Sequence, residues 1–579
     1  MSVIQIVHHQ GYPTPIVSQT SNGDETIVTP DGAKYIGNFH KTMRHNEFGE
    51  VVAADYDLLS QGLTASPGDA PGLIDQVPPG AQDSDQFVSP LAGQANERTL
   101  PHPTSVAMAP APKIQLASTA AEMVELYWMA LLRDVPFSEF KNNPRINQAI
   151  ADIRTAFQAA LDSDVNVDLG KLQLLTDLPA TGGNKLDIRL ETLFRCGLPG
   201  EDKGPIVSQF FLPTIHYGAQ LIDQRVQPYR SAGGDLKKDF LVTYEDWLDA
   251  QIRGKDRKNQ PYGTSRPELE KFVRPFLTMR DLATFVNQDA LHQAYFNAAL
   301  ILDRNYKAGP GNPYPSERQK GFVCFGGPHL LSLVSEVAAR ALKVVWHQKW
   351  QVHRRARPEA YGGLVHMQEI GVGGAKRRYG LSPVVLGSDA LALVRQQTGT
   401  SFLPMAFPQG SPTHPAYGAG HATVAGACVT ILKAWFGQDG NSPAIKDPVD
   451  LVSTDEYMSL PCTDEKDSTF PFTGPIRKLP SYKGGDTLTV EGELNKLACN
   501  VAMGRSMGGV HWRSDNVRSL RLGEKIAVIY LARELADFID RHPGGGAPYF
   551  TFQSFDRNRV VIMPGAVTIN GESAYAEYL

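Results

Sequence analysis

The chain has 579 residues, 42% of them hydrophobic, and a formal net charge of −5 at pH 7. This length is enough for a large buried core, either as two to four domains or as one unusually large helical domain. The negative net charge and the absence of a long basic stripe exclude a general nucleic-acid binder. No apolar run approaches the roughly 18 residues that cross a bilayer as a helix. The five cysteines are widely spaced and predict neither a zinc site nor a disulfide framework.

The first 115 residues are rich in Gly, Pro, Ser and Asp and show little periodicity. They predict an extended arm, residues 1–115, that wraps the core or a neighbouring subunit and so contributes to an oligomer, with disorder as the alternative. The N-terminus lacks a basic stretch followed by an apolar core, so we expect no secretory signal and a soluble protein, cytoplasmic by default.

Helical patterns dominate from Ser118 onward, with apolar residues at i, i+3 and i+4 spacing. This spacing predicts helices over Ala120–Leu132, Pro144–Leu161, Thr214–Arg225, Asp281–Asp303, Leu330–His353, Ala422–Phe436, Leu494–Met503 and Val517–Asp540. Short strands are predicted at Tyr549–Phe552 and Val560–Met563, between turn-forming residues. We therefore predict a mainly α fold with a few short β-strands, in which residues 116–579 form one helical domain.

Three distant segments supply the parts of a pocket for a tetrahedral oxyanion. In chain order they contribute Lys349 with Arg357-Pro358, then Gly420-His421, then Arg505 with His511. An oxyanion leaves water at a high cost unless fixed cations and N–H donors replace its hydration shell. Two arginine forks and one lysine point charge suit three equatorial oxygens.

Two histidines indicate what chemistry this pocket performs. A histidine can offer either a neutral nitrogen or a proton near neutral pH, and His421 and His511 allow one for each task. Asp515 follows His511 by four residues, an interval that puts both on one helical face, where the carboxylate would orient the ring. His421 ends a Pro/Gly-rich loop that runs into an apolar helix, and the N–H groups at such a helix start favour an anion.

The pattern of Lys, seven residues, Arg-Pro, then Gly-His, then Arg, five residues, His resembles the vanadium-dependent haloperoxidases. It resembles class A bacterial acid phosphatases and type 2 phosphatidic-acid phosphatases more distantly. The runs Lys349–Glu359 and Thr413–Tyr417 look closest to the red-algal and cyanobacterial bromoperoxidases. The similarity extends over most of residues 180–540.

The resemblance implies a vanadate cofactor and a core of two four-helix bundles. It makes His511 the ligand whose ring nitrogen binds vanadium. The groups that would hold the vanadate oxygens are Lys349, Arg357, Arg505 and the N–H of Gly420. Lys349 would also polarise the peroxide, His421 would act as acid/base, and His414 matches a second active-site histidine of the bromoperoxidases. Asp289, on a predicted helix, is the candidate carboxylate that orients His421.

Two residues depart from the family pattern. Ala419 stands where the family has serine, which removes a hydroxyl donor typically worth about 1.5–3 kcal/mol toward a charged acceptor. Trp346 stands where red-algal bromoperoxidases have arginine and the fungal chloroperoxidase type has tryptophan. We expect these two positions to affect vanadate affinity and halide preference.

The implied activity is oxidation of a halide, bromide or iodide before chloride, by hydrogen peroxide to hypohalous acid, which halogenates small organic compounds. A homo-oligomer without nucleic-acid or membrane partners is also implied. A phosphomonoester hydrolase with His511 as nucleophile is the alternative, and a non-catalytic scaffold that keeps the helical shell is the third hypothesis. The chain has no Cys-x-x-Cys-His motif for attaching haem covalently.

Overall fold

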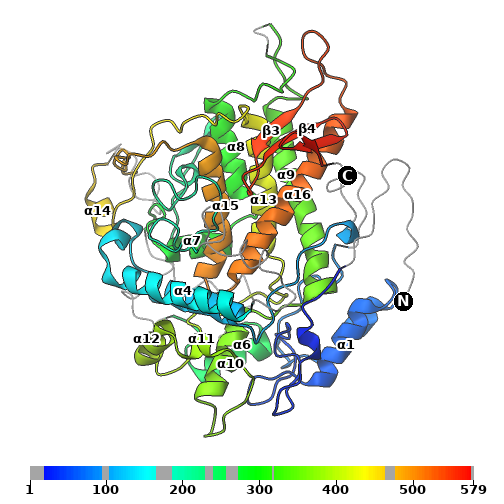
Figure 1. The fold of residues 1–579 in the computed structure, drawn as a ribbon, viewed down its shortest axis with the longest axis vertical. Coiled ribbons are helices and arrows are strands. Elements are labelled where there is room, and N and C mark those ends of the chain that lie inside the picture. The colour runs from blue at the N-terminus through cyan, green and yellow to red at the C-terminus, as the bar shows by residue number, and fades with distance from the viewer. Residues whose placement is uncertain are drawn as a thin grey trace.

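The computed structural model, drawn in Figure 1, describes residues 19–93, 103–164, 186–228, 239–255, 272–315, 318–462 and 476–574. Its helices are α1 (Ala53–Thr64), α2 (Ala70–Ile74), α3 (Ala117–Leu131), α4 (Pro144–Ser163), α6 (Tyr244–Arg253), α7 (Met279–Gln288), α8 (Gln293–Asn305), α9 (Gly327–His347), α10 (Pro358–Glu369), α11 (Pro383–Leu386), α12 (Asp389–Thr398), α13 (Gly420–Phe436), α14 (Thr454–Ser459), α15 (Val490–Met507) and α16 (Arg513–Asp537). Its strands are β1 (Ile215–Tyr217), β2 (Gln220–Ile222), β3 (Phe550–Gln553), β4 (Arg559–Met563), β5 (Ala566–Ile569) and β6 (Glu572–Ser573). The prediction of a mainly α fold with a few short strands is confirmed.

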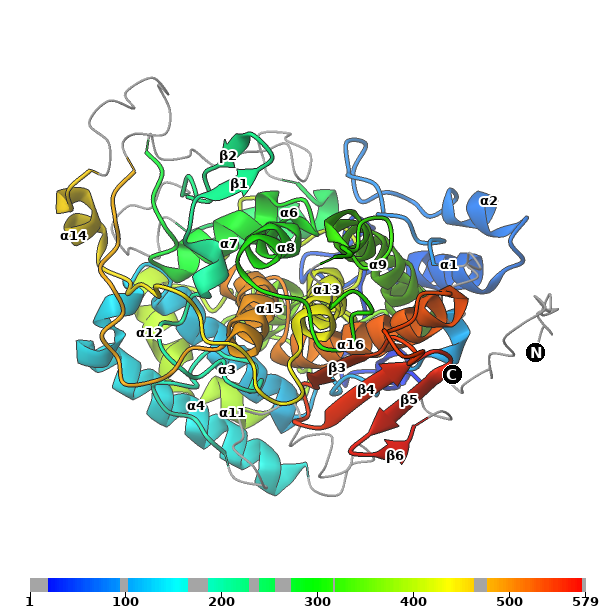
Figure 2. The same ribbon diagram turned by 90° about the horizontal axis from the view of Figure 1, so that it is seen from above.

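Helix α13 is the central element of the core. Every residue of α13 except His421 is buried, and the helix packs against α9, α15 and α16. Figure 2 shows this group with α8 beside it. A helix that is apolar on all sides is stable only inside such a bundle. The one partly exposed residue of α13 is therefore His421, in its first turn, where the predicted site lies.

Glycines bring α13 and α16 into close contact. A Cβ on Gly426 would lie 2.0 Å from the carbonyl oxygen of Leu520, and a Cβ on Gly523 would lie 2.1 Å from that of Thr423. No side chain fits at such distances, so only glycine allows the two backbones to approach this closely. The contact fixes the spacing of two helices that both border the predicted site.

Two predicted helices differ from the structure. Residues of the predicted helix Thr214–Arg225 form an antiparallel hairpin of β1 and β2. Its turn is made at Gly218, whose φ of 59° is a conformation that ends a helical run. The predicted helix Asp281–Asp303 is divided into α7 and α8, and Asp289 between them is extended. The other predicted helices form with ends that differ by a few residues.

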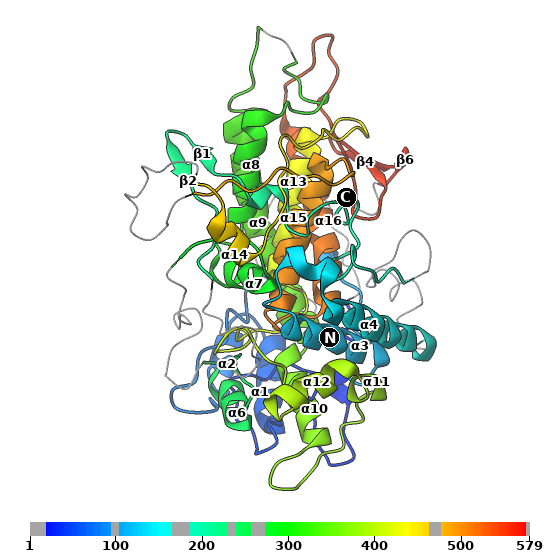
Figure 3. The ribbon, with the colours of Figure 1, turned by 90° about the vertical axis from the view of Figure 1, so that its left-hand side faces the viewer.

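The predicted C-terminal strands are confirmed as β3 and β4 of a four-stranded antiparallel sheet with the order β3-β4-β5-β6. Strand β3 packs against α13 and β4 against α16. Figure 3 shows the sheet at one end of the bundle and α1, α6 and α10 at the other. The sheet therefore covers the helix ends that are remote from the predicted site.

Residues 19–93 lie against the other end of the bundle. They enclose a second apolar cluster that includes Phe39, Met43, Tyr56 and, from the segment after α9, Trp350. This part of the chain is therefore in direct contact with the segment that carries Lys349. A domain boundary near residue 115 and a role of the first 115 residues in an oligomer stay predictions.

The structure also bears on the cysteines and on membrane insertion. All five cysteines are free. Within the described ranges, no helix combines the length and the apolar character that a bilayer span requires.

Candidate active site

The residues predicted for the site converge where α9 and α15 end and α13 and α16 begin. They are Lys349 after α9, Arg357 before α10, His414 before α13, Gly420 and His421 at the start of α13, Arg505 near the end of α15, and His511 before α16. Lys349 lies in a π-helical turn, Gln348–His353, a distortion that is frequent at functional sites. The contacts below connect the members of this group.

Arg357 joins the loop before α13 to the loop before α16. Pro358, at the first position of α10, holds Arg357 in an extended conformation. Its Nη1 donates to Nε2 of His511 at 3.0 Å and to the carbonyl oxygen of Val510 at 2.7 Å. Its Nη2 and Nε donate to Nδ1 and the carbonyl oxygen of His414 at 2.9 and 3.0 Å. The planar guanidinium thus sets the positions of two imidazoles at once.

The contacts of His511 define its tautomer. An arginine can only donate, so Nε2 of His511 accepts from Arg357 and carries no proton. Nδ1 lies 3.0 Å from Oδ2 of Asp515 and donates to it. Burial, followed by the charges of Arg357, Lys349 and Arg505, lowers the pKa of His511 well below its usual range. His511 is therefore neutral, with an Nε2 lone pair of the kind that a metal ligand needs.

The His511–Asp515 contact forms as predicted but not on a shared helical face. His511 precedes α16, which begins at Arg513, and Asp515 reaches back from the first turn. Oδ2 of Asp515 also accepts from the N–H of Trp512 at 3.0 Å, as a residue at this helix position commonly does. The carboxylate of Asp515 therefore both holds the loop before α16 and orients the imidazole of His511.

Lys349 is a fully buried cation. Its Nζ donates to the carbonyl oxygens of Pro415 and Gly418 at 2.9 and 2.5 Å. Burial, together with the charges of Arg357 and Arg505, lowers its pKa well below the usual value. Among the described residues, no carboxylate forms an ion pair with Lys349. An anion bound nearby would stabilise its charged form.

Arg505 completes the cationic set from α15. Its Nη1 donates to the carbonyl oxygen of Val286 at 2.7 Å. Its charge lowers the pKa of Lys349, His421 and His511, so the guanidinium lies within electrostatic range of all three. The structure therefore brings the three predicted cations together around the two predicted histidines.

His421 is bound to the predicted carboxylate. Its Nε2 lies 3.0 Å from Oδ1 of Asp289, whose side chain is 4% exposed, whereas that of His421 is 18% exposed. The carboxylate accepts, so Nε2 carries the proton and Nδ1 has the lone pair. The break between α7 and α8 gives Asp289 this position. Sequence spacing predicted the pair, but it predicted an uninterrupted helix.

Replacing Asp289 with asparagine should move the pH profile of the enzyme. Burial lowers the pKa of His421, while the charge and hydrogen bond of Asp289 raise it, so Asp289→Asn lowers this pKa further. Steady-state rates of peroxide-dependent halide oxidation, measured from pH 4 to 9, should rise with pH as His421 loses its proton. In Asp289→Asn this rise should occur at lower pH. The maximal rate should also fall, by up to the roughly 10²- to 10⁴-fold that acid–base groups contribute. Exposed Asp303→Asn is the matched control, and an unshifted rise in Asp289→Asn would contradict the assignment.

Both residues that depart from the family pattern border the pocket. The ring of Trp346 lies 4.9 Å from that of His414 and 5.2 Å from Nζ of Lys349. A Cβ on Gly420 would lie 3.3 Å from Cζ3 of Trp346. Ala419 is buried, and its N–H donates to Oγ of Ser519 at 2.8 Å. Changes at either position therefore act directly on the groups that surround the anion site.

The side chains of the site suit a metal-containing oxyanion better than they suit a metal cation alone. Asp289 and Asp515, the two carboxylates bonded to the site histidines, are both engaged. Oδ1 of Asp515 also accepts from Nη1 of Arg355 at 2.7 Å. No group of three or more His, Cys, Asp or Glu side chains in the described parts of the chain could hold a metal ion. Three cations, one imidazole lone pair and the N–H groups at the start of α13 match vanadate instead.

Sequence reasoning missed a buried ion pair that holds this site. Nζ of Lys41 lies 2.6 Å from Oε1 of Glu359 and donates to the carbonyl oxygens of Gln409 and Ser411 at 2.9 and 2.8 Å. Oε2 of Glu359 accepts from the N–H of Ser411 at 2.5 Å. The pair therefore joins the N-terminal segment to α10 and to the loop of His414. The one signal in the sequence was that Glu359 directly follows Arg357-Pro358.

Comparisons with known proteins agree with this geometry. A family model described as the VCPO second helical-bundle domain matches residues 329–538. The vanadium-dependent bromoperoxidase of Corallina pilulifera is 33% identical over 622 aligned residues, covering 94% of this chain and 95% of the relative. That of Ascophyllum nodosum is 31% identical, covering 96% and 91%. The homohexameric second vanadate-dependent bromoperoxidase of Ascophyllum nodosum superposes with a TM-score of 0.79 at 26% identity, covering 96% of this chain and 89% of that one.

The helix ends of the bundle bring buried cations together with the unprotonated Nε2 of His511. This arrangement suits an enzyme that depends on a bound oxyanion. The likeness to the algal enzymes covers nearly the whole chain. The chain belongs to the vanadium-dependent haloperoxidase family.

Proposed function

We propose that this enzyme oxidises bromide and iodide with hydrogen peroxide, using vanadate held by Lys349, Arg357, Arg505, the Gly420 N–H and His511. The observation that carries the proposal is the neutral Nε2 of His511, which faces Arg357 inside a pocket of buried cations. The hypohalous acid produced halogenates organic compounds in the proposed reaction. Preference for bromide over chloride rests on the bromoperoxidase names of the relatives.

Vanadate, when bound, supplies a Lewis acid that activates hydrogen peroxide toward attack by a halide. Nδ1 of His421 accepts the proton that the incoming peroxide loses, because Nε2 is already protonated toward Asp289. The resulting imidazolium is stabilised by the carboxylate. Lys349 and the two arginines hold the negative charge in place, and their burial strengthens this interaction.

The same residues would suit a phosphatase with His511 as nucleophile, and the comparisons do not favour that alternative. The relatives that cover nearly the whole chain are named bromoperoxidases. Trp346, next to His414 and Lys349, is the residue we propose to adjust halide preference.

We also propose that the enzyme forms homo-oligomers. The homohexameric relative from Ascophyllum nodosum supports this proposal. A cytoplasmic location stays a prediction.

The proposed function is tested by halide oxidation with and without vanadate in phosphate-free buffer. We expect peroxide-dependent oxidation of bromide and iodide only after vanadate is added, and inhibition by added phosphate. Hydrolysis of p-nitrophenyl phosphate that vanadate inhibits, without any halide oxidation, would favour the phosphatase. Binding of neither anion would favour a non-catalytic scaffold.

A further inference from the structure

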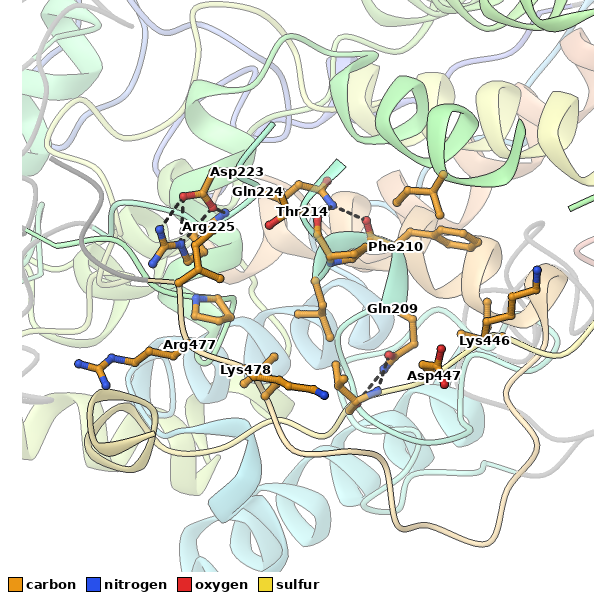
Figure 4. Close-up of a pocket in the computed structure, with 18 of the residues that line it drawn as sticks. Gln209, Phe210, Thr214, Asp223, Gln224, Arg225, Lys446, Asp447, Arg477 and Lys478 are labelled. Atoms are coloured by element: carbon orange, nitrogen blue, oxygen red, sulfur yellow. Dashed lines mark hydrogen bonds and ion pairs between the residues drawn. The ribbon is translucent and has the colours of Figure 1, made fainter. Parts of the chain in front are cut away.

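A cavity of about 460 Å³ opens beside the hairpin β1–β2, and Figure 4 shows it in close-up. The segments that line it are residues 209–214, 223–225, 445–449 and 476–479, with α8 on one side. Its apolar lining includes Phe210, Leu212, Ile301, Ile445 and Val449. This volume lies in the range of about 300–1,000 Å³ that is typical of pockets for small organic molecules.

The rim of this cavity is basic. Arg225, Lys446, Arg477 and Lys478 line it, against two carboxylates, Asp223 and Asp447. Arg225 is already bound to Asp223, with Nη2 2.7 Å from Oδ2.

Figure 4 shows Lys478 extending toward Gln209, while Lys446 lies on the far side near Asp447. Nζ of Lys446 donates to the carbonyl oxygen of Asn305 at 2.7 Å and lies 5.2 Å from the centroid of the Tyr306 ring. An apolar floor with a positive rim is complementary to an organic anion.

A second, smaller cavity shares a wall with this one and reaches the carboxylate bonded to His421. Asp223, Gln224 and Arg225 also line a second cavity, of about 280 Å³. This second cavity extends along α7 to Asp289, and Oδ1 of Asp289 is bonded to Nε2 of His421. Nε2 of Gln224 donates to the carbonyl oxygens of Phe210 and Pro213, both at 2.9 Å, which fixes the wall that the two cavities share. The second cavity therefore borders both the wall of the larger cavity and the carboxylate that is bonded to His421.

We propose that the larger cavity binds the organic acceptor of the halogen, and that this acceptor is an anion with an aromatic body. The inference rests on the proposed function. The carboxylate or sulfonate of the acceptor lies at the rim that Lys446 and Lys478 make positive, and the ring lies on the apolar lining. In the reaction the ring supplies the electron pair of the new carbon–bromine bond, and the bromine–oxygen bond of hypobromous acid breaks. The ring proton and the released hydroxide leave as water.

The test compares 6-hydroxy-2-naphthoate with 2-naphthol, which has the same rings without the carboxylate. Dissociation constants are measured by calorimetry on the full chain, without peroxide or halide. The variant is Lys446→Gln with Lys478→Gln, two exposed side chains, and exposed Lys376→Gln, which removes one charge of the same kind elsewhere, is the control. We expect the variant to bind the naphthoate at least about 10-fold more weakly, because it lacks two of the positive charges that are complementary to the carboxylate. Binding of 2-naphthol and the rate of iodide oxidation should be unchanged.

Equal affinity of the variant and the parent for the naphthoate would overturn the acceptor site. So would bromination of both naphthalenes with the same kcat/KM ratio in the parent and the variant, because halogenation would then occur away from the cavity. Charge-dependent binding in a protein that oxidises no halide would leave the anion site standing and overturn the proposed function, so the two failures are distinguishable.

Discussion

Replacement of His511 with alanine should abolish vanadate-dependent halide oxidation. Nε2 of His511 is an acceptor that faces the guanidinium of Arg357, because Nδ1 of the same ring donates to Asp515. Removal of a single transition-state donor commonly costs about 10²- to 10³-fold in rate, and loss of the proposed bond to vanadium should cost at least as much. We expect equilibrium dialysis in phosphate-free buffer to show weaker vanadate binding in the same variant.

Two comparisons make the His511 result specific. His216→Ala removes an exposed histidine of β1 and should leave both vanadate binding and halide oxidation unchanged. Asp515→Asn keeps the shape of the residue bonded to Nδ1 of His511 but removes the charge that favours the Nδ1-protonated tautomer. Vanadate affinity or the rate of halide oxidation should therefore fall by about 10- to 100-fold, as is common for residues that orient metal ligands. Parent-level vanadate affinity in His511→Ala would contradict the assignment of the metal ligand.

Replacement of Lys41 with methionine should both destabilise the protein and weaken vanadate binding. The change leaves Glu359 as a buried carboxylate without its cation, and it leaves the carbonyl oxygens of Gln409 and Ser411 without their donor. Breaking a buried pair in this way typically costs about 3–5 kcal/mol. The loop of His414 would then lose its hydrogen bonds to the N-terminal segment. Urea unfolding gives the free energy, and vanadate titration well below the unfolding midpoint gives the affinity.

A second ion pair from the same N-terminal segment is the control for Lys41. Arg378 binds Asp31 at 2.6 Å, but its side chain is 71% exposed, so water screens this pair. Arg378→Gln should change neither the unfolding midpoint nor the vanadate affinity measurably. If Lys41→Met loses stability but keeps parental vanadate affinity, the pair supports the fold alone and does not position the site.

The residues of the candidate site were easier to recognise in the sequence than the ends and breaks of the helices around them. The spacing and the residue types of four side chains indicate their chemistry without a structure; they are Lys349, Arg357, His421 and His511. The pairing of His421 with Asp289 was also predicted, although the break between α7 and α8 was not. That break depends on tertiary packing, which overrides the weak local preference for continuing a helix.

Other features had no local signal. The π-helical turn at Lys349 inserts one extra residue into a pattern that otherwise predicts a helix to His353. The hairpin β1–β2 contains apolar residues that fit a helical period as well as a strand. Lys41 is separated from Glu359 by more than half of the chain, and a lone lysine in a Gly- and Pro-rich segment most often lies in solvent. Its burial follows only from the way the segment wraps the bundle end.

The glycine contact between α13 and α16 has a consequence for how the enzyme can diversify. His421 is in the first turn of one of these helices and His511 precedes the other, so the close approach of the helices at Gly426 and Gly523 limits how far the two imidazoles can move apart. Changes at Trp346 and Ala419 would then leave the spacing of the two helices unaltered, so halide preference would vary while the proposed proton acceptor and the proposed vanadium ligand keep their separation.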